Sequence, residues 1–339
     1  MTANLGDYGP SLTAAADFIR QKDDFLVVAH VNPDGDAISS TLAVAEILRQ
    51  LGKRYILIND GAVPAKFSFL MGNEVILNGS ENPQLLFKNV ISVDCADYRR
   101  IGDVRFRFVE GTPLLNIDHH PTNDGFGIVN LVRPDAAATA EVLYDLAAVI
   151  GTEWTLQLAT LVYAGLSTDT GGFRYANTTP AVMKIASEML ALGVKGNEIA
   201  DRLLEKLTLT QIRLLQKALA KLSVSSDGKI AWISLTHDVI TETGASNDDM
   251  DGLVNYPRNI EGVEVGILFK EFAPGQFKAS LRSAGLVDVA SIAQIFGGGG
   301  HIRAAGCSLE GPVQDVTHRV IEAVEKSLSV RGIAGDSTR

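Results

Sequence analysis

Histidine and aspartate residues follow apolar segments at four places in the first half of the chain. In chain order they are His30, Asp34 and Asp36, then Asp94, then Asp118, His119 and His120, and finally Asp169. Singly, each has an ordinary explanation as part of a turn, a helix cap or a solvated loop. Gathered at one site, however, these side chains would supply oxygen and imidazole ligands without any thiolate, which suits a metal centre.

The chemistry expected of such a cluster follows from its charge. Carboxylates close together repel one another and raise each other's pKa values, and divalent cations relieve that repulsion. Oxygen-rich ligation with one or two imidazoles suits manganese or magnesium better than zinc. Two such ions about 3.5–4 Å apart form the arrangement used for in-line displacement at phosphorus. The residue types therefore favour a two-metal phosphoesterase.

The spacing of residues excludes two other kinds of site, which an acidic segment and a glycine-rich segment would otherwise suggest. An EF-hand that began at Asp34 would need a bidentate Glu at its twelfth position, where the chain has Ala45. The glycines at 297–300 are not followed by the Gly-Lys-Ser/Thr of a phosphate-binding P-loop. Neither an EF-hand nor a P-loop is expected.

Alternating strands and helices are expected to position the acidic and histidine residues. Short apolar runs predict strands over 25–30, 54–59, 90–94, 113–118 and 127–132. Helical spacing predicts helices over 37–51, with Asp36 as the N-cap, and over 137–150, 155–166 and 180–192. This alternation predicts an α/β fold, with a mostly parallel sheet covered by helices, whose carboxyl edge would bind the ligand.

The pattern changes after a charged helical stretch. Strands are expected over 230–235, 263–272 and 277–282, with helices over 287–296 and 313–329. The sequence thus predicts a catalytic domain over 1–194, a helical linker over 195–222 and a smaller α/β domain over 223–331.

The composition of the chain argues against two classes of partner, long duplex nucleic acid and membranes. The 339 residues carry a net charge of −10, with 40 acidic and 30 basic side chains, whereas proteins that grip long duplex nucleic acid normally have a basic excess. No apolar run is long enough for a membrane span and no signal peptide is visible, so no membrane partner is expected. The two cysteines, Cys95 and Cys307, fit a reducing cytoplasm.

The ordered motifs resemble those of one known superfamily. The series His30-x-x-x-Asp34-x-Asp36, Asp94, Asp118-His119-His120 and Asp169 resembles that of the DHH phosphoesterases. Arg282, followed by the glycines at 297–300, His301 and Ala304-Ala305-Gly306, is similar to the C-terminal domain associated with that superfamily. The resemblance covers roughly residues 15–325 and is greatest to the stand-alone nanoRNase/pAp-phosphatase group.

The resemblance implies two divalent metal ions, with manganese expected and magnesium or cobalt as alternatives. His30, Asp34 and Asp94 would hold one ion. The other ion would be held by Asp36, Asp94, His119 and Asp169, so that Asp94 bridges the pair. Asp118 would orient a histidine, and His120 would contact the phosphate or protonate the leaving oxygen.

The second domain is expected to bind the substrate's phosphate. Arg282 offers a bidentate guanidinium fork. Gly298, Gly299 and Gly300 would let main-chain N–H groups approach an anion, and His301 would add a side-chain contact. A flexible loop is the alternative explanation for the glycines.

The implied substrates are short single-stranded RNA and small nucleotides, in the cytoplasm, and a homodimer fits the group. Oligoribonucleotides of a few residues and linear dinucleotides would yield nucleoside 5′-monophosphates, and adenosine 3′,5′-bisphosphate would yield AMP. Two alternatives stay open at this point: a cyclic-di-AMP phosphodiesterase and a RecJ-like single-strand exonuclease. A non-catalytic nucleotide binder is not expected, because all six proposed ligand positions carry competent ligands, and hydrolysis of inorganic phosphate chains is not expected either.

Overall fold

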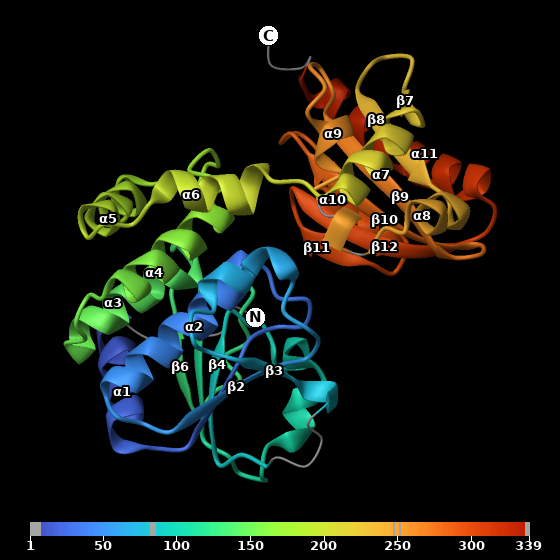
Figure 1. The fold of residues 1–339 in the computed structure, drawn as a ribbon. Helices are drawn as coiled ribbons and strands as arrows, with labels where there is room; N and C mark the ends of the chain where they lie inside the picture. The colour runs from blue at the N-terminus through green and yellow to red at the C-terminus, as the bar shows by residue number, and fades with distance from the viewer. Residues whose placement is uncertain (1–7, 82–85, 247, 251, 336–339) are drawn as a thin grey trace. The chain divides into compact units, whose positions relative to one another are not determined.

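The computed structural model describes residues 8–81, 86–246, 248–250 and 252–335 of the chain. The chain divides into two compact units, Met1–Lys206 and Leu207–Arg339, each with its own sheet (Figure 1). The stretch 195–222, expected as a linker, is shared between them. The helix α6 (Gly196–Ala200) and the π-helical turn η4 (Asp201–Glu205) belong to the first unit, and α7 (Leu209–Leu219) belongs to the second.

Six parallel strands form the sheet of the first unit, in the order β3-β2-β1-β4-β5-β6. They are β1 (Phe25–Val28), β2 (Tyr55–Asn59), β3 (Ile76–Asn78), β4 (Asn89–Val93), β5 (Leu114–Asp118) and β6 (Val129–Val132). The predicted α/β fold with a parallel sheet is confirmed. The strand order changes direction between β1 and β4, and open α/β sheets bind ligands beyond the carboxyl ends of strands at such a point.

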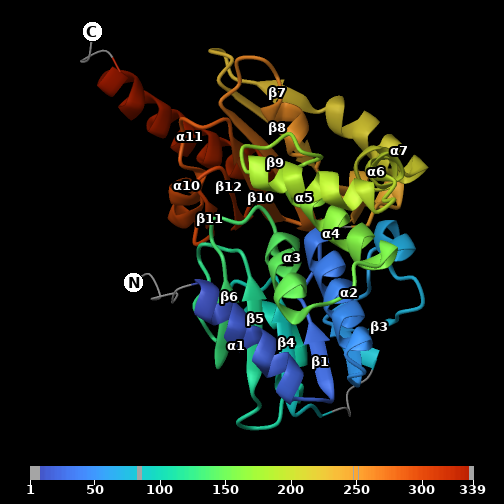
Figure 2. The same ribbon diagram turned by 90° about the vertical axis from the view of Figure 1, so that its left-hand side faces the viewer.

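Helices cover both faces of this sheet. The helices α1 (Tyr8–Gln21), α2 (Gly35–Gln50) and α3 (Thr139–Ile150) pack on one face, as Figure 2 shows, and α4 (Leu156–Asp169) packs against α2 and α3. The short turns of η3 (Tyr98–Arg107) cover the other face. Successive residues of β1 are buried on opposite faces, which explains why its sequence is continuously apolar.

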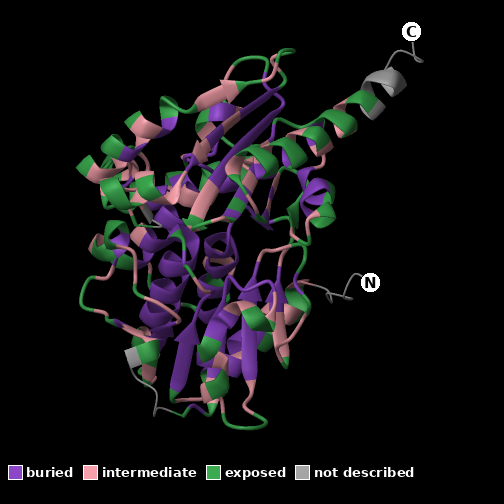
Figure 3. Ribbon diagram, turned by 90° about the vertical axis from the view of Figure 1, so that its right-hand side faces the viewer, coloured by how far each residue is buried: buried purple, intermediate pink, exposed green. Residues whose placement is uncertain are grey.

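Some elements of the first unit were not predicted. The helix α1 precedes the first strand and buries Ala15, Ala16, Phe18 and Ile19. The short helices η1 (Ala65–Leu70) and η2 (Gly79–Glu81) were not predicted either, whereas α5 (Pro180–Ala191) confirms the helix expected over 180–192. Buried residues are concentrated in the strands and the helices next to them (Figure 3).

The second unit contains a mixed sheet in the order β11-β12-β10-β9-β8-β7. Its strands are β7 (Leu222–Val224), β8 (Ile230–Leu235), β9 (Val265–Ala273), β10 (Gln276–Ser283), β11 (Gly299–His301) and β12 (Ala304–Glu310). Its other elements are α8 (His237–Thr243), η5 (Asp248–Met250), α9 (Asn255–Arg258), α10 (Val289–Ile295) and α11 (Val313–Gly335). The predicted smaller α/β architecture is therefore present in this part of the chain.

The last two glycines of the run, Gly299 and Gly300, form part of this sheet, whereas Gly297 and Gly298 precede the strand. The strand β11 pairs with β12 in an antiparallel ladder that places Gly300 opposite Ala305. Gly300 has a φ of 142°, and a Cβ at this position would meet the main chain of Ala304 and Ala305. Glycine is thus required here for close strand pairing. None of the helices described is long and apolar enough to cross a membrane.

Candidate metal centre

The loop after β1 delivers the first three predicted ligands. His30 lies two residues beyond the strand and is buried. Asp34, in extended backbone, is the N-cap of α2, because its Oδ1 accepts the N–H of Ala37 at 3.1 Å. The expectation that Asp36 is the N-cap is therefore wrong: Asp36 lies inside the first turn of α2, fully buried. Its carboxylate is directed to the tertiary contacts described next.

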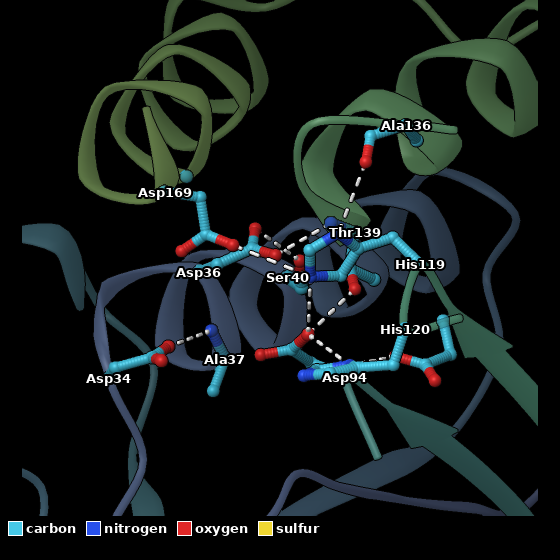
Figure 4. Close-up of polar contacts among 12 residues, drawn as sticks. Asp34, Asp36, Ala37, Ser40, Asp94, His119, His120, Ala136, Thr139 and Asp169 are labelled. Carbon is cyan, nitrogen blue, oxygen red and sulfur yellow. Dashed lines mark hydrogen bonds and ion pairs between the residues drawn. The ribbon is translucent and has the colours of Figure 1, made fainter. Parts of the chain in front are cut away.

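The carboxylate of Asp36 accepts hydrogen bonds from the beginning of α3. The main-chain N–H groups of Thr139 and Ala140 lie 2.6 and 3.1 Å from its two oxygens, and the Ser40 hydroxyl donates at 3.3 Å (Figure 4). Unpaired N–H groups and the helix dipole make a helix N-terminus favourable for a negative charge. These contacts stabilise a carboxylate that is otherwise shielded from water.

Asp94 lies between the two predicted halves of the centre. It follows β4 with a φ of +57°, a left-handed conformation that is uncommon outside glycine and recurs at functional sites. Its Oδ2 lies 3.4 Å from His30 Nε2, and its Oδ1 lies 3.6 Å from His119 Nε2. One carboxylate thus faces a histidine on each side, as a bridging ligand would.

The segment after β5 presents its two histidines in different ways. His119 Nδ1 donates to the carbonyl of Ala136 at 3.2 Å, so its Nε2 faces Asp94 and Asp169. His120 Nδ1 lies 2.7 Å from Asp118 Oδ1. Asp118 is fully buried and holds the ring of His120.

Asp169 completes the cluster from the end of α4. The sequence placed it in a loop after a helix, but it is the last residue of the helix. Its Oδ2 lies 3.4 Å from His119 Nε2. The sequence predicted that the helix ends before Asp169, because a charged residue after a run of apolar residues suggests that the helix has already ended.

Three overlapping groups of side chains could hold a metal ion. Within each group, the ligand atoms lie within 4.8 Å of one another. The groups are His30, Asp34 and Asp94; Asp36, His119 and Asp169; and Asp94, His119 and His120. The structure therefore brings together all six residues predicted as ligands and adds His120 as a neighbour. Carboxylate and imidazole donors in this ratio fit manganese or magnesium.

The pKa values of Asp36 and Asp169 show that charge on these two carboxylates is unfavourable without a cation. Burial raises the pKa of Asp36 well above its usual range, and the charges of Asp94 and Asp34 raise it further. Burial and the charge of Asp36 likewise raise the pKa of Asp169. Burial lowers the pKa of His30, but the hydrogen bond and charge of Asp94 outweigh that effect and leave it raised. Protons and a divalent cation would therefore compete for these side chains.

The predicted substrate-binding residues of the second unit lie in neighbouring strands. Arg282 on β10 and His301 on β11 both pair with Ala304 of β12, from opposite sides. Directly paired residues project from the same face of a sheet, so the two side chains share one face. Gly298, Gly299 and Gly300 lie immediately before His301.

Comparison with family models gives a result for both units. Residues 24–166 match the N-terminal domain of the DHH family, and residues 227–329 match the DHHA1 domain. The chain belongs to the DHH family of phosphoesterases. The resemblance noted in the motif series is confirmed. DHH phosphoesterases depend on metal ions, in keeping with the cluster beyond β1, β4 and β5.

Individual relatives agree with this assignment. A bifunctional oligoribonuclease and PAP phosphatase, NrnA, from Thermus thermophilus is 37% identical over 307 residues, which cover 90% of each chain. NrnA from Bacillus subtilis is 31% identical and covers 85% of this chain and 90% of its own. The crystal structure of an exopolyphosphatase-related protein from Bacteroides fragilis superposes with a TM-score of 0.87 at 26% identity, covering 94% of this chain and 96% of its own.

The sequence did not reveal several residues that support the DHH-domain cluster. Thr139 donates its hydroxyl hydrogen to Asp94 Oδ1 at 2.9 Å. Asn123 donates to Asp118 Oδ2 at 2.6 Å and to the carbonyl of Cys95 at 3.0 Å. A threonine at a helix start and an asparagine in a turn are common everywhere, so neither had a signal of its own.

Proposed function

We propose that this DHH phosphoesterase hydrolyses short oligoribonucleotides and linear dinucleotides to nucleoside 5′-monophosphates, and adenosine 3′,5′-bisphosphate to AMP. The observation that carries the proposal is the pair of donor groups on either side of Asp94, in a chain that aligns along its length with two enzymes named oligoribonuclease and PAP phosphatase. A small, anionic substrate suits a protein with a net charge of −10 whose positive charge would come from bound cations.

Two divalent cations, manganese by preference, are proposed to bind at the cluster. His30, Asp34 and Asp94 would hold one of them, and Asp36, Asp94, His119 and Asp169 the other. When bound, such ions supply Lewis acidity and lower the pKa of a water that serves as the nucleophile. The donor atoms of His30, Asp34 and Asp94 lie within 4.8 Å of one another, as do those of Asp36, His119 and Asp169. Asp94 Oδ1 lies 3.6 Å from His119 Nε2, which supports Asp94 as a member of the second set.

The contribution of His120 follows from its hydrogen bond. Its Nδ1 donates to Asp118, so its Nε2 is the atom available to a phosphate or to the leaving oxygen. Burial lowers the pKa of His120, but the hydrogen bond and charge of Asp118 outweigh it and leave the pKa raised. We propose that Nε2 carries a proton near neutral pH and gives it to the leaving ribose oxygen.

The face shared by Arg282 and His301 is proposed to bind a phosphate of the substrate. Arg282 would form two parallel hydrogen bonds with phosphate oxygens, and His301 would add a third contact. The main-chain N–H groups of Gly298, Gly299 and Gly300 are proposed to line the same anion site.

Cellular location and assembly also belong to the proposal. Cys95 and Cys307 are both buried and free, which fits a reducing cytoplasm. The homodimer implied by the resemblance is tested by light scattering during gel filtration, where a monomer mass at micromolar concentration would exclude it.

A product assay with manganese tests the proposal. We compare RNAs of 2, 5 and 20 nucleotides, adenosine 3′,5′-bisphosphate, cyclic-di-AMP, pyrophosphate and inorganic polyphosphate, the last because of the name of the Bacteroides relative. Rapid release of mononucleotides from the 2- and 5-mers, together with AMP from the bisphosphate, is the expected result. Equal rates on 20-mers would indicate a single-strand exonuclease, and hydrolysis of polyphosphate alone would replace the proposal.

A variant control accompanies this assay. Asp94→Asn should abolish every one of these activities, whereas Asp17→Asn, whose side chain is 51% exposed on α1, should leave them unchanged. Normal activity in Asp94→Asn would contradict the assignment of Asp94 as the ligand shared by both ions.

A further inference from the structure

One short turn contacts carboxylates of both proposed metal sets. It comprises residues 136–140, at the start of α3, and is called the 136–140 turn below. Within it, the N–H of Thr139 donates to Asp36 at 2.6 Å and the hydroxyl of the same residue donates to Asp94 at 2.9 Å (Figure 4). Ala140 adds a second N–H to Asp36 at 3.1 Å. Thr139 thereby joins a ligand on α2 to a ligand that follows β4.

The same turn contacts the other two elements of the centre. The carbonyl oxygen of Ala136 accepts from His119 Nδ1 at 3.2 Å, which requires the proton to be on Nδ1 and leaves Nε2 for a metal. The carbonyl oxygen of Ala137 accepts from Asn177 Nδ2 at 3.2 Å, and that amide also donates to the carbonyl of Asp169 at 3.1 Å. Four proposed ligands are thus connected to five consecutive residues.

Glu141 and Arg133 hold the turn in place. Glu141 is 2% exposed and accepts the N–H of Ala137 at 2.8 Å, while its second oxygen lies 3.2 Å from the guanidinium of Arg133. The main-chain N–H of Arg133 donates to the carbonyl of Asp118 at 3.0 Å. A buried carboxylate persists only when its charge is paired and hydrogen-bonded. The ion pair and the main-chain hydrogen bond of Arg133 therefore fix the position of the 136–140 turn relative to His119 and His120, which follow β5.

We propose that the 136–140 turn sets the geometry of the metal centre, with Thr139 and Asn177 as its positioning residues. Thr139 fixes the separation of the Asp36 and Asp94 carboxylates, and Asn177 fixes the end of α4 that carries Asp169. The inference rests on the proposed metal centre, but it does not depend on which substrate is hydrolysed.

A purely structural role for the turn makes a different prediction. If Thr139 only stabilised the fold, its loss would lower the melting temperature of the metal-free protein and leave manganese affinity unchanged. If it positions ligands, the affinity itself falls, because partners that orient metal ligands typically contribute about 10–100-fold to metal affinity. Metal affinity is therefore the readout that separates the two.

The experiment measures Mn²⁺ binding to the full chain by calorimetry after removal of metal with EDTA. Thr139→Val removes the hydroxyl with little change in volume, and Thr139→Ser restores it. Thr41→Val is the matched control, because the Thr41 hydroxyl is equally buried but donates only to the carbonyl of Ala37. Asn177→Ala is an independent second variant. Its Oδ1 has no hydrogen-bond partner among the described residues, so the truncation removes no contact at that atom.

We expect Thr139→Val and Asn177→Ala to weaken Mn²⁺ binding at least about tenfold, with Thr139→Ser and Thr41→Val close to the wild type. Unchanged affinity in Thr139→Val, or equal losses in Thr139→Val and Thr41→Val, overturns the inference. If Thr139→Val does not fold, Asn177→Ala decides in the same way. A wild-type chain that binds no Mn²⁺ overturns the proposed metal centre itself, a result distinct from a failure of the positioning role.

Discussion

Nδ1 of His120 lies 2.7 Å from a carboxylate oxygen of Asp118, a residue that is fully buried beneath the site. The charge and hydrogen bond of Asp118 raise the pKa of His120 against the opposing effect of burial. Asp118→Asn removes the charge, so the pKa of His120 should fall and the alkaline limb of the kcat profile should move to lower pH. A limb in the same position would show that His120 is not the acid.

Replacing His120 itself separates proton transfer from binding. His120→Gln should lower kcat by about 10²–10⁴-fold, the range for loss of general acid catalysis. KM and Mn²⁺ affinity should change little, because the six proposed ligands stay in place. A strong loss of Mn²⁺ affinity would instead make His120 a ligand, as its membership of one donor group allows.

The position of Asp94 between His30 and His119 predicts that its loss affects both metal ions. Asp94→Ala should abolish hydrolysis and reduce the Mn²⁺ content of both sites, as measured by elemental analysis. Asp34→Ala should reduce the Mn²⁺ content of only one of the two sites. Several kcal/mol of transition-state stabilisation from the ions correspond to a loss of roughly a thousandfold or more. Normal turnover in Asp94→Ala would contradict the bridging assignment.

The raised pKa values of Asp36 and Asp169 predict a link between protons and metal. Because these carboxylates bind protons more tightly in the metal-free protein than free carboxylates do, Mn²⁺ binding should release protons and grow tighter as pH rises. Calorimetry in two buffers with different ionisation enthalpies measures the number released. Zero release at every pH from 5 to 8 would contradict the cause assigned to these shifts.

The same shifts fix the sign of the effect on stability. A carboxyl whose pKa is raised in the folded state contributes fully below its unfolded value, about 4, and this contribution is lost as pH rises through the folded value. The raised pKa of His30 acts in the same direction. In EDTA, the contribution of Asp36, Asp169 and His30 to the melting temperature should therefore fall as pH rises above about 4, and Mn²⁺ should reduce that fall.

Much of the parallel sheet and the chemistry of the site could be predicted from local sequence patterns. Continuous apolar runs such as the one in β1 identify strands buried on both faces, and an acidic or histidine residue at the end of such a run is conspicuous. The candidate ligands were therefore recognisable by residue type, before any distance was known.

The contacts that arrange those ligands could not be predicted in this way. Thr139 and Asp36 are 103 residues apart, and no local pattern connects them. Asp34 and Asp36, which are separated by Gly35, could each cap α2, and only the tertiary contacts of Asp36 show that Asp34 is the cap. A flexible loop was one explanation of the glycine run because glycine weakens an isolated strand, whereas Gly299 and Gly300 pair with β12 and the close approach of the strands requires glycine at Gly300.

Arg282 is expected to act on the substrate without affecting the metal ions. Arg282→Ala should raise KM about 10–100-fold, the loss expected when a charged hydrogen-bonding partner of a phosphate is removed, while kcat and Mn²⁺ affinity stay within about threefold. Arg282→Lys should restore the wild-type KM only in part, because an ammonium cannot form the bidentate fork.

Lys278→Ala is the matched control for Arg282→Ala. Lys278 is exposed on the same strand, and because it is four residues away it lies on the same face. A KM that rises equally in Lys278→Ala would indicate attraction of the substrate by overall charge. A loss of Mn²⁺ affinity in Arg282→Ala would contradict the separation of metal binding in the DHH domain from phosphate binding in the DHHA1 domain.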